Sequence, residues 1–396
     1  MKIRVGVFFG GKSVEHEVSV ITGLQAYNHI DREKYEPVPI YITKDGKFYV
    51  GEKIGAIEAY RNIPALLKES VQVIPVNDGG CKLMRYPMKK FGDNVMAAID
   101  VALPAVHGTN VEDGAFQGFL QTLGVPYASC DVLSSAVGMD KYVMKTVFKD
   151  NDIPVLPCVV VNVKEYTRGT EEIVARIEEK TTYPVIIKPV NLGSSVGIRK
   201  AKNREELIDA LEYGFTFSLR VLVENAVTEL KEINCSVLGD YEDAEASECE
   251  EPVANDEILS YQDKYVSGGK SGKNSGMASL KRKIPADITP EMREEIRTLA
   301  VKAFKCLGCS GVARIDFMLD KATGKIYLNE LNTIPGSLSF YLWEPMGVKY
   351  SELLDRMISL AFKRERENKS ISFSFDTNIL ENISLGGAKG AKGSKM

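Results

Sequence analysis

The chain has 396 residues, of which 44% are hydrophobic and 26% are charged, so it can bury a large core and is long enough for two or three domains. Its formal net charge of −4 and its pI near 5.7 provide no basic surface to neutralise a phosphate backbone, which argues against nucleic acid and favours small-molecule partners. The N-terminal run MKIRVGVFFGG is too short to span a membrane and lacks a cleavage site, so we expect a cytoplasmic protein without membrane insertion. The seven cysteines are scattered, and in a cytoplasmic protein we expect them to be reduced.

The first third of the chain alternates strand-like and helix-like segments. Strands are expected at 3–9, 38–42 and 101–105, and a helix is expected from about residue 17 to residue 30. Such alternation is typical of a parallel α/β layer, in which functional groups lie on the loops that leave the strand ends. We therefore expect residues 1–128 to form an N-terminal parallel α/β domain.

The remaining sequence predicts two α+β lobes, a central one at 129–225 and a strand-rich C-terminal one at 226–368. The expected elements are helices at 139–149, 170–180 and 290–307 and strands at 159–163, 184–189, 220–224, 232–238, 312–319 and 325–331. Thr289 followed by Pro290 is the candidate N-cap of the last helix.

Two polar segments interrupt the C-terminal lobe. Residues 240–257 are acidic, and residues 266–283 are rich in Gly, Ser and Lys. A long polar loop inside a domain is usually either functional or disordered, and this one lies between elements that carry candidate site residues. We interpret residues 256–283 as a mobile lid. The tail at 369–396 is expected to be disordered.

The strongest local signal is a pair of consecutive strands in the C-terminal lobe. Alternate residues of a strand face the same way, so Arg314 shares a face with Asp316, and Glu330 shares a face with Asn332. If the register places Asp316 opposite Glu330, two carboxylates and an amide oxygen converge, and such hard oxygen donors suit Mg²⁺. A hairpin with one solvated polar face is the alternative interpretation.

A glycine-rich segment, KPVNLGSSVG at 188–197, follows an expected strand and supplies a lysine, two glycines and two hydroxyls. Glycine lets backbone N–H groups approach phosphate oxygens, and a lysine places a positive charge on them. The order of a Walker A loop is absent, and GGKS at 10–13 does not fit the dinucleotide-binding pattern. An ordinary Gly-Ser turn is the alternative.

Two other positions are candidates because of their location. Glu15 falls at the expected N-terminus of a helix, where a carboxylate also favours the helix dipole. His107 is one of only three histidines and opens the polar loop HGTNVEDG, which follows an expected strand.

Seven motifs occur in the order found in the D-alanine–D-alanine ligases of the ATP-grasp superfamily, and the chain resembles this family over about residues 1–365. The motifs are GGKSVEHEVS, HGTNVEDGAFQG, MDK, IKPVNLGSSVG, YQDKY, RIDF and NELNTIPG. The resemblance implies a three-domain ATP-grasp fold, in which the central and C-terminal lobes enclose ATP. It also implies a homodimer.

The resemblance assigns residues to a nucleotide site. The implied nucleotide-binding residues are Lys141, Lys188, Ser195, Glu224, Glu232 and Lys264, with Lys141 and Lys188 at the phosphates, the strand end at Glu224 near the adenine and Glu232 at the ribose. Asp316, Glu330 and Asn332 would bind two Mg²⁺ ions, with Mn²⁺ as an alternative.

The implied reaction joins two D-alanine molecules for peptidoglycan precursor synthesis, through an acyl phosphate formed from ATP. Glu15 would pair with the ammonium of the first substrate and connect through Ser194 to Tyr265 of the lid. Arg314 and the N–H of Gly336 would hold the tetrahedral oxyanion. The implied substrate-binding residues are His107, Ser339, Tyr341 and Leu342.

Three departures from the family pattern concern the substrate site. Val111 replaces a usual glycine, the lid is longer and more basic, and Tyr341 stands where serine is frequent, near the carboxylate of the second substrate. The last departure leaves D-lactate and D-serine as alternative second substrates. An ATP-binding sensor without ligase activity is a further hypothesis, against which the set Glu15, Ser194, Tyr265 and Arg314 argues.

Overall fold

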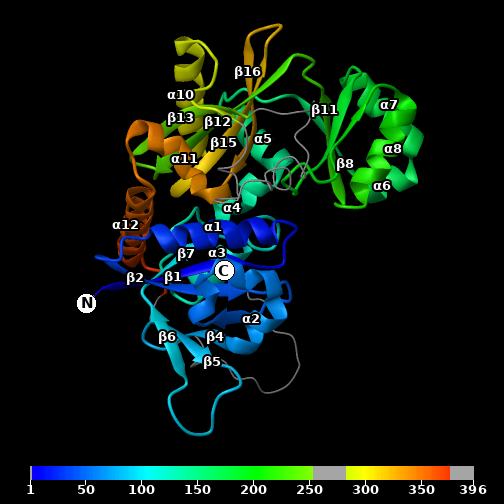
Figure 1. The fold of residues 1–396 in the computed structure, drawn as a ribbon. Coiled ribbons are helices and arrows are strands. Elements are labelled where there is room, and N and C mark those ends of the chain that lie inside the picture. Colours follow the sequence, from blue (N-terminus) through cyan, green and yellow to red (C-terminus); the bar gives the residue numbers. More distant parts are fainter. Residues whose placement is uncertain (1, 253–281, 375–396) are drawn as a thin grey trace, which may run out of the picture.

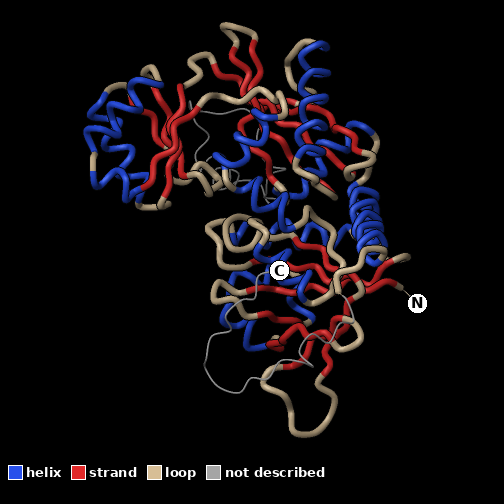
Figure 2. Tube along the Cα trace, turned by 180° about the vertical axis from the view of Figure 1, so that it is seen from behind, coloured by secondary structure: helices blue, strands red, loops and turns tan. Residues whose placement is uncertain are grey.

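The computed structural model describes residues 2–252 and 282–374, which form three β-sheets with associated helices (Figure 1). In Figure 1 the first sheet lies in the lower half, with the second sheet at the upper right and the third at the upper left. The view from behind shows the same three groups of strands (Figure 2). Within the described ranges, no helix is long and apolar enough to cross a membrane.

The first sheet has seven strands in the order β6-β5-β4-β3-β2-β1-β7. Their bounds are β1 (Ile3–Gly10), β2 (Tyr35–Ile42), β3 (Phe48–Val50), β4 (Val71–Asn77), β5 (Cys81–Arg85), β6 (Val95–Ile99) and β7 (Val101–Pro104). Strand β1 is parallel to β2 and β7, as predicted, whereas β2 to β6 pair antiparallel. The antiparallel strands β3 to β6 were not predicted; tight turns join β2 to β3 and β4 to β5, whereas parallel pairing needs a long crossover.

The helices of this part are α1 (His16–His29), η1 (Glu52–Gly55), η2 (Ile57–Asn62), α2 (Ile63–Glu69) and α3 (Ala115–Thr122). Helix α1 lies very close to β1, because a Cβ atom added to Gly23 would be 2.4 Å from atoms of Phe9. Glycine at this position lets the helix approach the sheet. Ser19, near the start of α1, accepts from the N–H of Gly10 and donates to the carbonyl of Ala105, so this end of the helix lies beside the loops that follow β1 and β7.

The second sheet is antiparallel, with the strand order β10-β9-β11-β8. Its strands are β8 (Cys158–Asn162), β9 (Val185–Pro189), β10 (Arg199–Ala201) and β11 (Arg220–Asn225), and the helices that pack on it are α6 (Val163–Arg168), α7 (Thr170–Lys180) and α8 (Arg204–Phe215). The preceding helices, α4 (Val132–Met139) and α5 (Lys141–Asp150), pack towards the third sheet. The Asp140 side chain accepts hydrogen bonds from the N–H groups of Tyr142 and Val143, so it caps α5 and fixes Lys141 in the first turn.

The third sheet has the order β14-β13-β12-β15-β16. Its strands are β12 (Leu230–Gly239), β13 (Ala244–Pro252), β14 (Arg282–Lys283), β15 (Gly311–Asp320) and β16 (Lys325–Asn332), and the helices are α10 (Pro290–Cys306), η4 (Gly336–Ser339), α11 (Phe340–Trp343), η5 (Glu344–Met346) and α12 (Tyr350–Lys369). The predicted cap of α10 is confirmed, since the Thr289 side chain accepts from the N–H of Met292.

The prediction of an acidic loop at 240–257 is wrong for residues 244–252, which form β13. Two of its glutamates, Glu248 and Glu250, are buried because partners from distant segments neutralise them: Arg293 pairs with Glu248, and Arg282 pairs with Glu250. The predicted lid at 256–283, with Lys264 and Tyr265, lies outside the described residues except for β14, and most of the tail at 369–396 also lies outside them.

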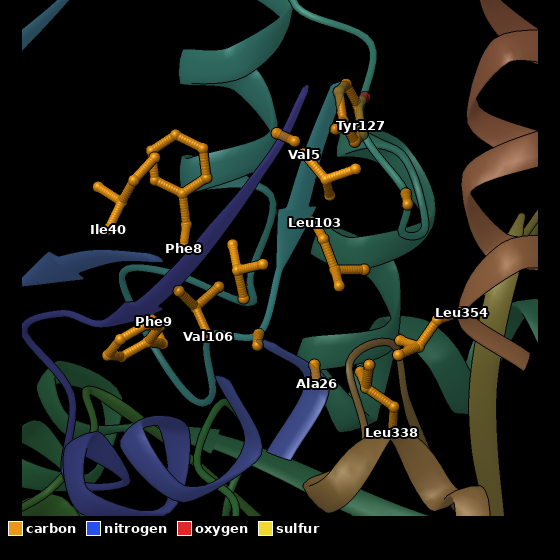
Figure 3. Packing of buried hydrophobic residues seen from close by; sticks show 14 of the residues in the cluster. Val5, Phe8, Phe9, Ala26, Ile40, Leu103, Val106, Tyr127, Leu338 and Leu354 are labelled. Atoms are coloured by element: carbon orange, nitrogen blue, oxygen red, sulfur yellow. The ribbon is translucent and has the colours of Figure 1, made fainter. Parts of the chain in front are cut away.

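The main hydrophobic core combines both ends of the described chain. Val5 and Leu103 of the first sheet share a cluster with Leu338 and Leu354 from the C-terminal segment (Figure 3). The helical segment that follows β16 therefore packs on the N-terminal sheet, although β16 itself belongs to the third sheet. The domain boundaries proposed at residues 128, 225 and 368 remain a proposal.

Candidate active site

A cavity of about 520 Å³ is lined by residues from all three parts of the chain. The predicted site residues in its wall are Glu15, His107, Lys141, Lys188, Ser194, Ser195, Glu224, Glu232, Arg314, Asp316, Glu330, Asn332 and Gly336. Ser339, Tyr341 and Leu342 are buried but do not belong to the described wall. The glycine-rich loop and the acidic hairpin, far apart in sequence, thus share one cleft.

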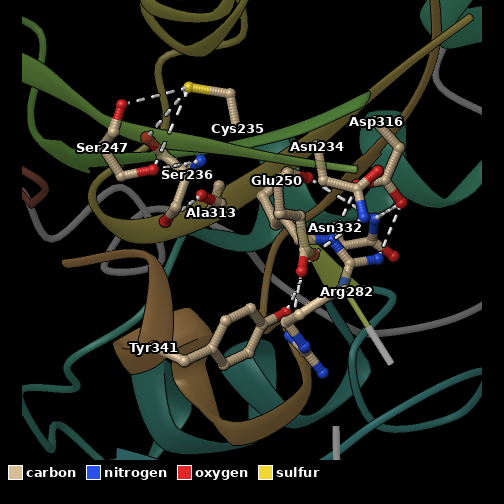
Figure 4. Close-up of polar contacts among 11 residues, drawn as sticks. Asn234, Cys235, Ser236, Ser247, Glu250, Arg282, Ala313, Asp316, Asn332 and Tyr341 are labelled. Carbon is tan, nitrogen blue, oxygen red and sulfur yellow. Dashed lines mark hydrogen bonds and ion pairs between the residues drawn. The ribbon is translucent and has the colours of Figure 1, made fainter. Parts of the chain in front are cut away.

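The strand register of the acidic hairpin, β15 and β16, is the one that brings the proposed Mg²⁺ ligands together. Asp316 pairs with Glu330, and Arg314 pairs with Asn332, next to a bulge between Asp316 and Phe317. The guanidinium of Arg314 donates two hydrogen bonds to Asp316, of 2.6 and 2.7 Å. The amide of Asn332 donates one of 3.1 Å to the same carboxylate (Figure 4). Burial opposes the charge of Arg314, but the adjacent Asp316 carboxylate raises its pKa above the ordinary value, so the guanidinium stays charged.

Asp316, Glu330 and Asn332 of the hairpin, two acidic residues and an amide, line the cavity. Within residues 2–252 and 282–374, no group of three or more His, Cys, Asp and Glu side chains could hold a metal ion. Mg²⁺ nevertheless needs few protein ligands, because it keeps several waters and takes further oxygens from substrate phosphates. The chemistry of Asp316, Glu330 and Asn332 therefore fits Mg²⁺ bound together with a nucleotide.

Two buried lysines share one buried glutamate on the side of the cleft that the second sheet forms. Lys145 bonds to Glu224 at 2.6 Å, and Lys188 bonds to the other oxygen of the same carboxylate and to Asn329 at 3.0 Å. Burial would raise the pKa of Glu224, yet Lys188 and Lys145 outweigh it and lower that pKa to about 2. A third lysine, Lys141, pairs with Glu330 at 3.1 Å and so connects this side to the hairpin.

The loop that follows β9 reaches the start of α1. The Ser194 hydroxyl donates to Glu15, and both Ser194 and Ser195 have left-handed backbones, with φ of 54° and 59°. Gly108 packs against the same carboxylate, since an added Cβ atom would be 2.8 Å from the Oε2 atom of Glu15. These contacts join Glu15 and Ser194, as the family resemblance implied, and Tyr265 lies outside the described residues.

His107 is fully buried and engaged at both ring nitrogens. Its Nδ1 donates to the carbonyl of Ile334 at 2.8 Å, and its Nε2 accepts from the hydroxyl of Thr22 at 2.7 Å. Burial lowers the pKa of His107 to about 4, so the ring is neutral near pH 7 and this arrangement of donor and acceptor is fixed. These contacts indicate a positioning role, and the predicted contact with the substrate stays a prediction.

Tyr341 is part of a buried polar cluster (Figure 4). Its hydroxyl donates to Glu250 at 3.2 Å, and the guanidinium of Arg282 lies 3.9 Å from the centre of its ring. Asn234 and Arg282 also donate to Glu250, at 3.0 and 2.9 Å. Burial and the Glu250 carboxylate raise the pKa of Tyr341 to about 12, so the phenol stays protonated.

Because the phenol donates to Glu250, we expect Tyr341→Phe to leave the KM for the second substrate within about threefold of the wild-type value. The free energy of unfolding should fall by about 1 kcal/mol, as for one lost hydrogen bond. Steady-state kinetics and thermal denaturation measure both effects. Arg282→Ala is the comparison variant, since it removes the cation stacked on the ring. A KM increase of tenfold or more for Tyr341→Phe would mean that the phenol binds the substrate directly.

Several residues in and around this cavity escaped the sequence analysis. Glu112 lies inside the HGTNVEDG motif and accepts hydrogen bonds from the N–H groups of Gly108 and Ile334, both at 2.9 Å. Burial and the nearby Glu15 carboxylate raise the pKa of Glu112 to about 8. Lys145, Thr22 and Glu250 carry no local signal, because their partners are distant in sequence. The position of Lys145, four residues after Lys141 on one helix, is the only pattern that could have drawn attention to it.

Comparisons with known proteins agree with this geometry. A family profile described as D-ala D-ala ligase N-terminus matches residues 4–130, and one described as D-ala D-ala ligase C-terminus matches residues 147–359. The D-alanine–D-alanine ligase of Thermosipho africanus is 40% identical over 380 residues, which cover 96% of this chain and 98% of the relative.

Solved structures give the same result. The D-alanine–D-alanine ligase of Coxiella burnetii is 29% identical with a TM-score of 0.78, covering 93% of this chain and 96% of that one. The VanG D-Ala:D-Ser ligase of Enterococcus faecalis is 30% identical with a TM-score of 0.74, covering 91% and 100%. The Bacillus anthracis ligase complexed with ATP is 25% identical with a TM-score of 0.64, covering 92% and 99%.

The three sheets, with a cleft in which lysines face carboxylates, define a member of the ATP-grasp class. Within this class, the profile matches cover both parts of the chain, and the relatives match it over almost its full length. The chain belongs to the D-alanine–D-alanine ligase family.

Proposed function

We propose that the protein uses ATP to join two D-alanine molecules into D-alanyl-D-alanine, as a step of peptidoglycan precursor synthesis. The observation that carries this proposal is the single cleft in which the lysine-bearing glycine loop faces the acidic hairpin. Family membership and the names of the relatives support the same activity. We also propose a cytoplasmic homodimer, which light scattering on the purified protein would test.

The first step brings together two anions, the carboxylate of D-alanine and the γ-phosphate of ATP. Lys141 and Lys188 lie in the cleft wall to neutralise the phosphates, and the glycine loop lets backbone N–H groups approach them. Asp316, Glu330 and Asn332 would hold Mg²⁺, which supplies further neutralisation of the phosphate oxygens. The D-alanine carboxylate oxygen then bonds to the γ-phosphorus, and ADP leaves.

Glu15 is placed to bind the ammonium of the first D-alanine. The carboxylate is 8% exposed and lines the cavity, and the hydroxyl of Ser194 donates to it. A fixed anion at the start of the first helix holds the amino group of the first substrate away from the reacting carboxylate. Orientation of this kind accounts for a large share of catalysis in a reaction between two bound molecules.

In the second step, the amine of the second D-alanine attacks the acyl carbon, loses a proton and displaces inorganic phosphate. Arg314 and the N–H of Gly336 would stabilise the oxyanion of the tetrahedral intermediate. Arg314 is suited to this role because it lines the cavity and Asp316 holds its guanidinium plane with two hydrogen bonds. The bidentate contact fixes the orientation of the guanidinium before the charge develops.

D-serine and D-lactate remain candidate second substrates. The D-Ala:D-Ser ligase at 30% identity favours testing D-serine first. Incubation with ATP, Mg²⁺ and equal amounts of D-alanine, D-serine and D-lactate, followed by mass spectrometry, identifies the product. We expect mainly D-alanyl-D-alanine. A dominant D-alanyl-D-serine or depsipeptide product would overturn the assignment of D-alanine as the second substrate. The sensor hypothesis is tested by a separate measurement, and ATP binding without D-alanine-dependent phosphate release would support it.

A further inference from the structure

A short turn after β16 carries Gly336, and side chains from two distant segments hold it. The N–H of Ile334 donates to Glu112 Oε1 at 2.9 Å, and the carbonyl of Ile334 accepts from His107 Nδ1 at 2.8 Å. Both polar groups of one residue are therefore fixed by the loop that follows β7. The other oxygen of Glu112 accepts from the N–H of Gly108 at 2.9 Å, which anchors the carboxyl group itself.

The far side of Gly336 is held by helix α1. The N–H of Ser337 donates to the Thr22 hydroxyl oxygen at 2.9 Å, and that hydroxyl donates its proton to His107 Nε2, 2.7 Å away. Thr22 and His107 are both buried, at 0% and 3% exposure, so water does not compete for these bonds. The backbone N–H of Gly336 thus lies between two anchored neighbours, Ile334 and Ser337, with Pro335 contributing no N–H of its own.

The backbone of this turn requires such support. Ser337, Leu338 and Ser339 all have left-handed conformations, with φ of 54°, 50° and 53°. Residues with side chains disfavour this region, and three in succession persist only where surrounding contacts determine them. The hydrogen bonds of Thr22, His107 and Glu112 are contacts of this kind, and Leu338 adds packing in the main core.

We propose that Thr22, His107 and Glu112 act as positioning residues that fix the Gly336 N–H in the direction of the cavity. The inference rests on the proposed function, in which that N–H stabilises the oxyanion formed when the second amine attacks the acyl phosphate. Thr22 connects the two sides of the turn, because its hydroxyl group accepts the hydrogen bond of the Ser337 N–H and also donates to His107, which fixes the orientation of that ring.

Thr22→Val tests the proposal, since valine has nearly the same shape but can neither accept from Ser337 nor donate to His107. We expect kcat to fall at least about tenfold, while the KM for ATP stays within about twofold of the wild-type value. Complete removal of an oxyanion donor lowers kcat by roughly 10²–10³-fold, and a displaced donor should cause part of that loss. Thr22→Ser keeps the hydroxyl and should recover kcat to within about threefold of the wild-type value.

A second readout separates positioning from general damage. Slower attack by the second amine leaves the acyl phosphate more time to hydrolyse, so Thr22→Val should raise the ratio of phosphate released to dipeptide formed. A merely structural defect lowers both products together and leaves the ratio unchanged. Thr43→Val is the matched control, because Thr43 is also buried and its hydroxyl accepts from the N–H of Lys47 in the β2–β3 turn. We expect the control to keep the wild-type kcat and ratio.

Wild-type kcat and an unchanged ratio in Thr22→Val would overturn the proposal, and so would a Thr22→Ser variant as slow as Thr22→Val. Both results presuppose a wild-type protein that makes dipeptide. A wild type that makes none contradicts the proposed function itself, so the two failures are distinguishable.

Discussion

Replacing Asp316 by alanine is expected to abolish ligation, with kcat reduced by at least about 100-fold. Removal of residues that only support a metal ligand already lowers metal affinity or activity by about 10–100-fold, so loss of a ligand should have at least the larger of these effects. Asp316 is a proposed Mg²⁺ ligand and also orients Arg314 through two hydrogen bonds. Its loss therefore removes metal affinity and leaves the buried guanidinium without its anion. Dipeptide formation measured over a range of Mg²⁺ concentrations gives the effect on rate and on metal dependence.

Two controls make this result specific. Asp316→Asn keeps the shape of the side chain, so a loss of activity in a folded protein follows from the missing charge. Asp320→Asn changes the last residue of the same strand, where the carboxylate accepts from the turn residues Ala322 and Thr323, and should keep activity within about twofold. Near-normal activity of Asp316→Ala at limiting Mg²⁺ would show that the metal assignment is wrong.

The second large effect concerns stability. Glu224→Gln is expected to lower the free energy of unfolding by about 3–5 kcal/mol, the usual result of leaving buried charge without its partner, because Lys145 and Lys188 would lose their shared carboxylate. Denaturant unfolding near pH 7 measures this loss. ATP affinity should weaken as well, because an unpaired Lys188 loses its fixed position in the cleft wall.

The pH dependence of stability gives an independent test of the same ion pairs. The pKa of Glu224 is about 2 in the folded protein, against an ordinary value of 4.5, so the charged carboxylate stabilises the fold fully above pH 4.5. This contribution, about 3 kcal/mol at about 1.4 kcal/mol per pKa unit, is lost as the pH falls from 4.5 towards 2. Over this range the wild-type protein should lose more stability than Glu224→Gln.

Glu165→Gln is the matched control for this experiment. Glu165 also pairs with a cation, Arg176, but its side chain is 40% exposed. Exposed ion pairs contribute about 0–1 kcal/mol, so we expect little change in unfolding free energy for this variant. Equal losses in the two variants would contradict the assignment of Glu224 as a buried anion that stabilises two lysines.

Periodicity in the sequence was sufficient to predict the paired strands of the hairpin and the cap at Thr289, because these depend on neighbours within a few residues. Strand β13 was not predicted, because a run of glutamates in a sequence is typical of a solvent-exposed segment. In the structure, Arg282 and Arg293 from other segments pair with two of these glutamates. Burial of charge is decided by tertiary partners, and alternation of polar residues along one strand does not reveal them.

The candidate site shows the same division. Glu15, Lys188 and Asp316 were found because each lies in a motif whose residue types match the chemistry, and the structure brings all three into one cavity. Thr22 and Lys145 were not found, because their significance depends on partners at Ser337 and Glu224, 315 and 79 residues away. Their own neighbours along the chain give no indication of these contacts.

The most direct test of the account uses D-alanine labelled with oxygen-18 in its carboxylate. If that carboxylate attacks the γ-phosphate of ATP in the cleft, one labelled oxygen must leave with inorganic phosphate when the second amine displaces it. Mass spectrometry of the released phosphate should therefore show one labelled oxygen atom for each dipeptide formed. Phosphate without label, released at the rate of dipeptide formation, would contradict the proposed reaction.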